Sequence, residues 1–152
     1  MPRLSAIILS GGMSSRMGSP KGLLQVSGRT LIEAHVESFA TAGVHQIVIV
    51  LGHHREMYEN HIATFKRSWG ERISVAVNPD PERGQFSSLQ CGLSGLAELQ
   101  GAFVTPVDAL PASRDLLLGL LSALPGRDAC VPEYDGRLGH PALVAHHKFA
   151  EL

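Results

Sequence analysis

A glycine-rich segment near the N-terminus carries two basic residues and could bind phosphate. Residues 9–22 read Leu-Ser-Gly-Gly-Met-Ser-Ser-Arg-Met-Gly-Ser-Pro-Lys-Gly. Glycines such as Gly11 and Gly12 let backbone N–H groups approach an anion closely. Arg16 offers a planar fork to phosphate oxygens and Lys21 a compact point charge, with no acidic residue between them. The segment predicts an anion site, although a solvated turn with two exposed cations has the same composition.

Two common phosphate motifs are absent from this segment. A Walker A loop ends in Gly-Lys followed by Ser or Thr, whereas Lys21 follows Pro20. A dinucleotide-binding fingerprint needs Gly-x-Gly-x-x-Gly, which does not occur here. The segment therefore fits neither of these phosphate-binding loops.

Apolar runs alternate with helical patterns along the chain. We predict helices with caps at Thr30 and Ser113 and a stop at Gly43. The alternation implies a three-layer α/β/α, Rossmann-like fold whose mostly parallel sheet is covered on both faces. Ligands of such folds bind beyond the carboxyl ends of the strands, so the loops after the first, third and fourth strands are candidates. The predicted strands cover 6–9, 47–51, 73–77, 102–104, 129–131 and 142–145, and the helices 30–42, 54–65, 87–99 and 113–124.

Composition limits the classes of function. The 152 residues, 44% hydrophobic and 18% charged, suit one globular domain over 1–152. A net charge of −1 gives no overall field for nucleic acid. The N-terminal apolar run is too short for a signal peptide or a membrane span, so we expect a cytoplasmic protein without a membrane partner.

The cysteines and histidines give no metal-binding pattern. Cys91 and Cys130 lie far apart and are predicted to be buried thiols in a reducing compartment. The pairs His53-His54 and His146-His147 do not predict zinc, because adjacent side chains point in different directions on a strand or a helix.

The chain resembles the nucleotidyltransferases that build molybdenum-cofactor dinucleotides, the molybdopterin guanylyltransferases and cytidylyltransferases. These are relatives of the sugar-phosphate nucleotidyltransferases. The first motif of the resemblance is Gly-Gly-x-Ser-x-Arg-Met-Gly-x-x-Lys-x-Leu-Leu over 11–24. Four further motifs follow in the family's order over 50–53, 84–93, 106–111 and 136–141, so the resemblance covers nearly the whole chain.

The resemblance implies a role for each residue of the first motif. Leu9, Gly11, Gly12 and Ser14 would line the triphosphate and the part of the site near the base. Arg16 and Lys21 would hold the β- and γ-phosphates and stabilise charge on the leaving pyrophosphate. The attacking group is already an anionic phosphate, so positioning and charge neutralisation should supply most of the rate.

The same resemblance makes Asp108 the Mg²⁺ ligand. Asp108 follows an apolar strand in a Pro-Val-Asp-x-x-Pro turn. A hard cation takes one or two carboxylates plus phosphate oxygens. The alternative is a turn-forming aspartate that bonds its own backbone.

The remaining motifs imply contacts to the base and to the acceptor. Ser87 and Ser88 are predicted to open a helix and to bind the nucleotide, although helix capping is an equal alternative. We treat Asn78 and Asp80 as ordinary loop residues. Arg137 and His140 would contact the phosphate of the pterin acceptor, which is implied by the motif over 136–141. A neutral hydrogen-bonding role for His140 is the alternative.

The sequence departs from the family near its end. Family domains continue beyond the position of Leu152 and supply a second metal-binding carboxylate, so the fold is expected to be C-terminally shortened. An open sheet edge would invite pairing with another chain, and a homodimer is the resulting hypothesis.

Three functions follow from this sequence. The first is transfer of a nucleotidyl group from CTP or GTP to molybdopterin, with pyrophosphate as product. The motifs after the second strand and over 136–141 favour CTP, whereas Leu9 to Gly12 looks like the guanylyl branch. The second is the same chemistry on a sugar phosphate or another phosphorylated metabolite. The third is a non-catalytic nucleotide- or pterin-binding protein, for instance a partner of a molybdoenzyme.

Overall fold

A six-stranded sheet forms the centre of the protein in the computed structural model, which describes residues 3–13, 18–96 and 100–152. The strand order is β5-β4-β1-β6-β10-β7. The first four of these strands are parallel, and β10 runs antiparallel to both β6 and β7. The strands are β1 (Leu4–Ser10), β4 (Gln46–Leu51), β5 (Ile73–Val77), β6 (Gly101–Pro106), β7 (Ala129–Cys130) and β10 (Ala142–Ala145).

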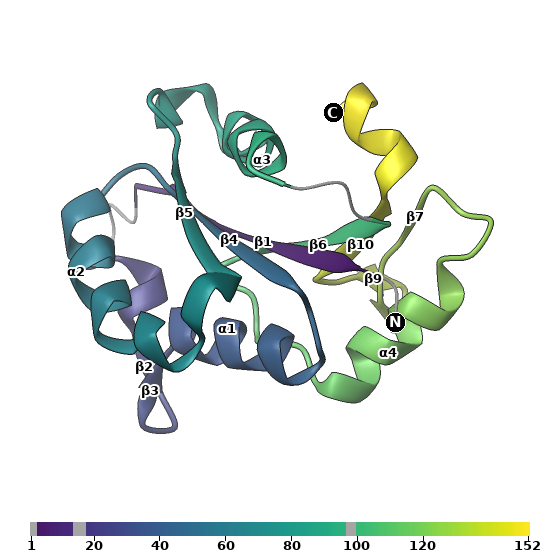
Figure 1. Ribbon diagram of the computed structural model, residues 1–152, viewed down its shortest axis with the longest axis horizontal. Coiled ribbons are helices and arrows are strands. Elements are labelled where there is room, and N and C mark those ends of the chain that lie inside the picture. The colour runs from purple at the N-terminus through teal and green to yellow at the C-terminus, as the bar shows by residue number, and fades with distance from the viewer. Residues whose placement is uncertain (1–2, 14–17, 97–99) are drawn as a thin grey trace.

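Helices cover both faces of the sheet, which confirms the three-layer prediction. Figure 1 shows α1 (Leu31–Thr41), α2 (Arg55–Phe65) and α4 (Arg114–Ala123) on one side, with α3 (Gln85–Ser94) and the 3₁₀ helix η5 (His146–Glu151) on the other. Side chains alternate between these faces along β1, as the pleat requires. Ala6 and Ile8 pack in the core cluster that includes α1 and α2, whereas Ile7 and Leu9 pack in the cluster under α3.

The predicted helix caps are present. Thr30 Oγ1 accepts a hydrogen bond from the backbone N–H of Glu33, and the Glu33 carboxylate accepts one from the backbone N–H of Thr30. This capping box fixes the start of α1. Gly43 has φ of 87°, a left-handed conformation that ends the helix without strain. Ser113 Oγ accepts from the N–H of Leu116 and so begins α4.

One predicted helix has the wrong boundaries. The pattern predicts a helix over 87–99, but α3 runs from Gln85 to Ser94, and Gly95 caps its C-terminus. Gly84, with φ of 91°, begins the helix earlier, so Ser87 and Ser88 lie inside the first turn. Glycine readily adopts this backbone conformation, which side chains disfavour.

Two short hairpins were not predicted. They are β2 (Gln25–Val26) with β3 (Arg29–Thr30), and β8 (Glu133–Tyr134) with β9 (Arg137–Leu138). Each turn has two consecutive residues with positive φ, Ser27-Gly28 and Asp135-Gly136. Such pairs are typical of tight hairpins, and the Asp-Gly dipeptide is a signal readable from the sequence.

The prediction that both cysteines are buried is wrong. Cys91 and Cys130 are free thiols as predicted, but both are partly exposed. No helix in the described part of the chain is long and apolar enough to cross a membrane.

The packing of α3 on the sheet requires glycine at position 92. A Cβ at Gly92 would lie 2.7 Å from Ile7 Cγ2 and 3.0 Å from Val50 Cγ2. We therefore expect Gly92→Ala to lower the free energy of unfolding by about 1–3 kcal/mol through overpacking. Gly119→Ala in α4, where a Cβ meets nothing within 4 Å, should raise it by about 0.5–1 kcal/mol. Denaturant unfolding of both variants measures this difference, and equal effects would contradict it.

Candidate functional site

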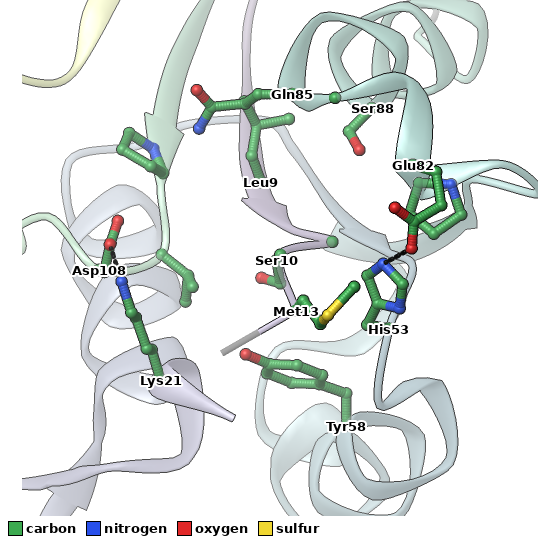
Figure 2. A pocket seen from close by; sticks show the side chains of 16 residues that line it. Leu9, Ser10, Met13, Lys21, His53, Tyr58, Glu82, Gln85, Ser88 and Asp108 are labelled. Atoms are coloured by element: carbon green, nitrogen blue, oxygen red, sulfur yellow. Dashed lines mark hydrogen bonds and ion pairs between the residues drawn. The ribbon is translucent and has the colours of Figure 1, made fainter. Parts of the chain in front are cut away.

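A cavity of about 530 Å³ opens at the carboxyl ends of the parallel strands. Figure 2 shows its walls, which come from the ends of β1 and β6, the loops after β4 and β5, the turn at Lys21, and helices α2 and α3. The parallel strands end at one edge of the sheet, so segments far apart in the sequence meet there. The lining residues are Leu9, Ser10, Gly11, Gly12, Met13, Lys21, His53, Tyr58, Pro81, Glu82, Gly84, Gln85, Ser88, Pro106, Val107 and Asp108.

The structure brings many of the predicted site residues together in this cavity. Those that line it are Leu9, Gly11, Gly12, Lys21, Ser88 and Asp108. Three others, Ser87, Arg137 and His140, are not among its lining residues. Ser14 and Arg16 lie outside the described residues.

An ion pair joins the two predicted charged groups. Lys21 Nζ lies 2.8 Å from Asp108 Oδ2, and both side chains are about half exposed, at 44% and 46%. The hydrogen bond from Lys21 is the main reason that the pKa of Asp108 lies below its usual range. A smaller electrostatic contribution to the lowered pKa of Asp108 comes from His140. A cation and a carboxylate thus face the same cavity.

A buried tyrosine holds the turn that carries Lys21. The phenol oxygen of Tyr58 on α2 accepts a hydrogen bond of 3.0 Å from the backbone N–H of Gly22. A Cβ at Gly22 would lie 2.8 Å from that oxygen, so only glycine allows this approach. Burial raises the pKa of Tyr58, which keeps the phenol protonated. The contact fixes Lys21 relative to α2.

A buried histidine holds the turn that carries Asp108. The Nε2 atom of His35 on α1 lies 3.0 Å from the carbonyl oxygen of Ala109 and 3.2 Å from that of Val107. Two carbonyl acceptors require a protonated Nε2 as donor. Burial lowers the pKa of His35, so the ring is neutral with its proton on Nε2. Sequence analysis missed this residue; the available signal was one polar residue at helical spacing among apolar ones.

Asn78 positions the two serines of α3. Its side chain is buried, and Nδ2 donates to Ser87 Oγ at 2.8 Å and to Ser88 Oγ at 3.0 Å. Asn78 Oδ1 accepts from the backbone N–H of Asp80, and Ser87 Oγ donates to the carbonyl of Gly84. Asn78, expected to be an ordinary loop residue, thus holds both serines of α3 by hydrogen bonds. Ser87 serves the local structure, while Ser88 faces the cavity.

The adjacent histidines diverge, as their spacing predicts. His53 Nε2 lies 3.3 Å from Glu82 Oε1 at the cavity wall, and His54 Nε2 lies 2.8 Å from the carbonyl oxygen of Met13. Within 3–13, 18–96 and 100–152, no three His, Cys, Asp or Glu side chains are grouped to hold a metal ion.

Family comparison agrees with this geometry. The family described as the MobA-like NTP transferase domain matches residues 6–152. The chain belongs to this family. It is a nucleotidyltransferase by that membership. The resemblance stated from the motifs is thereby confirmed.

Curated relatives that match nearly the whole chain include the following two. Nicotine blue oxidoreductase from Paenarthrobacter nicotinovorans is 32% identical, over 95% of this chain and 72% of its own length. A probable molybdenum cofactor guanylyltransferase from Bacillus cereus (strain Q1) is 29% identical, over 97% of this chain and 70% of its own length. The relatives of this chain thus carry names for different reactions.

Solved structures share the fold. Rv0371c from Mycobacterium tuberculosis H37Rv superposes with a TM-score of 0.77 at 22% identity, over 99% of this chain and 75% of its own. The manganese complex of the same protein gives a TM-score of 0.71 at 21% identity, over 98% and 74%. The 4-diphosphocytidyl-2C-methyl-D-erythritol synthase of Anaerococcus prevotii gives 0.75 at 17% identity, over 99% and 74%. These likenesses confirm the Rossmann-like architecture.

The Lys21–Asp108 ion pair predicts how the pKa of Asp108 responds to mutation of Lys21. Lys21→Met should raise the pKa of Asp108 toward its usual value, because the hydrogen bond from Lys21 is the main cause of its lowering. The parent carboxylate therefore stays ionised to lower pH. Whatever stability the pair adds is lost as pH falls through the lowered pKa, and exposure limits it to about 1 kcal/mol or less. NMR titration of the carboxyl group measures the pKa of Asp108, and Lys66→Met is the control. An unchanged pKa in Lys21→Met would show that Lys21 is not the cause of the lowering.

Proposed function

We propose that this enzyme transfers a nucleotidyl group from CTP or GTP to molybdopterin. CTP is the favoured donor. An oxygen of the acceptor phosphate attacks the α-phosphorus, the bond from that phosphorus to the bridging oxygen breaks, and pyrophosphate leaves with the electron pair. The observation that carries the proposal is the Lys21–Asp108 pair in the cavity at the carboxyl edge of the sheet. It supplies a cation for phosphate and a carboxylate for a metal ion in one place.

The residues present fit Mg²⁺ as the cofactor. Asp108 is ionised, half exposed and faces the cavity, and the other lining carboxylate, Glu82, contacts His53. One protein carboxylate with phosphate and water as further ligands is a usual Mg²⁺ arrangement. A bound Mg²⁺ would neutralise charge on the phosphates. The manganese complex of Rv0371c supports a divalent cation in this fold.

Lys21 and the glycine-rich segment are proposed to hold the phosphates. The ammonium group of Lys21, released from Asp108 when a cation takes the carboxylate, would contact the β- and γ-phosphates together with Arg16. Gly11, Gly12 and Ser14 would line the nucleotide. Since the acceptor phosphate is already anionic, these residues mainly orient the triphosphate and stabilise the leaving pyrophosphate.

The base is proposed to lie against Leu9, Gly11 and Ser88. A Cβ at Gly11 would lie 2.9 Å from Ser88 Oγ, so glycine leaves the approach between β1 and α3 open. The hydrogen bond from Asn78 Nδ2 orients the Ser88 hydroxyl. Ser87 contributes by fixing the first turn of α3.

The acceptor is proposed to lie on the side of Arg137 and His140. Both residues are exposed, and His140 contributes electrostatically to the lowered pKa of Asp108. The relative named as a molybdenum cofactor guanylyltransferase supports a molybdopterin-type acceptor. A sugar phosphate is the alternative acceptor, and pyrophosphate release with each acceptor separates the two.

The first experiment is calorimetry of Mg²⁺-dependent binding of CTP, GTP, ATP and UTP, followed by pyrophosphate release with molybdopterin. Asp108→Asn should remove the Mg²⁺ dependence of binding and lower turnover roughly a hundredfold or more. The charge-matched control is Glu71→Gln, an exposed residue before β5 and outside the cavity lining, which should behave as the parent. Retained Mg²⁺ dependence in Asp108→Asn would refute the metal role. Binding without any pyrophosphate release would instead favour a non-catalytic binding protein.

Lys21 has its own test. Lys21→Ala should weaken triphosphate binding about tenfold or more, because it removes a charge-assisted contact, while the fold stays intact. Lys66→Ala, at an exposed site after α2, is the matched control. Calorimetry measures affinity and circular dichroism checks folding; parent-like affinity in Lys21→Ala would show that the lysine does not hold phosphate.

A further inference from the structure

Ser10 carries a buried hydroxyl that has no hydrogen-bond partner among the residues that the structure describes. It is the last residue of β1, is 2% exposed, and lines the cavity. Among the described residues, Ser5 is the other with such a hydroxyl; it lies near the opposite end of β1 and does not line the cavity. Leaving a buried hydroxyl without a partner costs roughly 1–3 kcal/mol. Such groups are rare in folded proteins and call for an explanation.

The position of Ser10 indicates what its partner would be. Along β1, Ser10 shares the face of Ala6 and Ile8, which is the face covered by α1 and α2. The Lys21 turn is attached to that same side through Gly22 and Tyr58. In Figure 2 the Ser10 hydroxyl points away from Met13, toward the side of the cavity where Lys21 and Asp108 lie. The hydroxyl therefore belongs with the charged groups and not with Ser88 on α3.

We propose that Ser10 is a further ligand-binding residue, whose hydroxyl donates a hydrogen bond to a phosphate oxygen of the bound nucleotide. The inference rests on the proposed function. A hydroxyl donating to an anionic oxygen makes a charge-assisted bond, stronger than one between neutral groups. The hydroxyl is buried in the structure, in which Lys21 and Asp108 are paired. A cation and a triphosphate that draw these two groups apart would open that side of the cavity to the phosphate.

The test compares Ser10→Ala with Ser5→Ala. Both variants remove a buried hydroxyl without a partner from β1, so neither should lower stability by the loss of a hydrogen bond. Ser10→Ala should weaken Mg²⁺-dependent binding of CTP or GTP, whichever the parent binds, about tenfold or more. Ser5→Ala should bind as the parent does. The matching nucleoside, cytidine or guanosine, should bind parent and Ser10→Ala equally in an NMR titration, since it lacks phosphate.

Three results would overturn the inference. Parent-like triphosphate affinity in Ser10→Ala would remove the phosphate contact and leave the proposed function standing. Equal weakening of nucleoside and triphosphate would assign the hydroxyl to the base or ribose. A parent protein that binds no triphosphate would remove the proposed function and this inference together.

Discussion

The register of β1 between β4 and β6 is the constraint on which the site depends. All seven residues of β1 are buried, and its ladders run in parallel from Ser5 to Ser10 with β4 and from Leu4 to Leu9 with β6. The ladder continues past the strands, because the N–H of Val107 donates to the carbonyl oxygen of Leu9 at 3.0 Å. A shift of β1 by one residue would exchange its two apolar faces. The packing of the core therefore fixes the position of the glycine-rich segment relative to Asp108.

Three buried polar side chains turn this coarse placement into a defined geometry. His35, Tyr58 and Asn78 each come from an element that carries none of the proposed charged groups, and each hydrogen-bonds a segment of the cavity wall. Buried polar groups are costly unless paired, so these bonds hold the loops in one arrangement. The common role of these three side chains is to position the segments that line the cavity. Fold and family do not fix the substrate, and relatives of this chain carry names for different reactions.

Much of the fold could be predicted from the sequence because local patterns determine it. Apolar runs identified all six strands of the main sheet, and Thr30 and Ser113 identified two helix starts. The antiparallel direction of β10 could not be predicted, since an apolar run carries no strand direction. His35 and Asn78 were missed because their partners are distant in the chain or fixed only by tertiary packing. The glycine segment and Asp108 stood out because each follows a predicted strand, at the edge of the sheet where ligands of such folds bind.

The Lys21–Asp108 contact has a consequence for how ligands would enter. The two groups neutralise each other, so the cavity wall offers neither an isolated carboxylate nor an isolated ammonium at this point. A metal ion arriving alone must compete with the ammonium, and a polyphosphate arriving alone must compete with the carboxylate. Each would liberate the group that the other needs, which is positive heterotropic linkage, and the mutual enhancement must be equal in both directions. An ion pair of this kind would favour the preformed metal–nucleotide complex over either component.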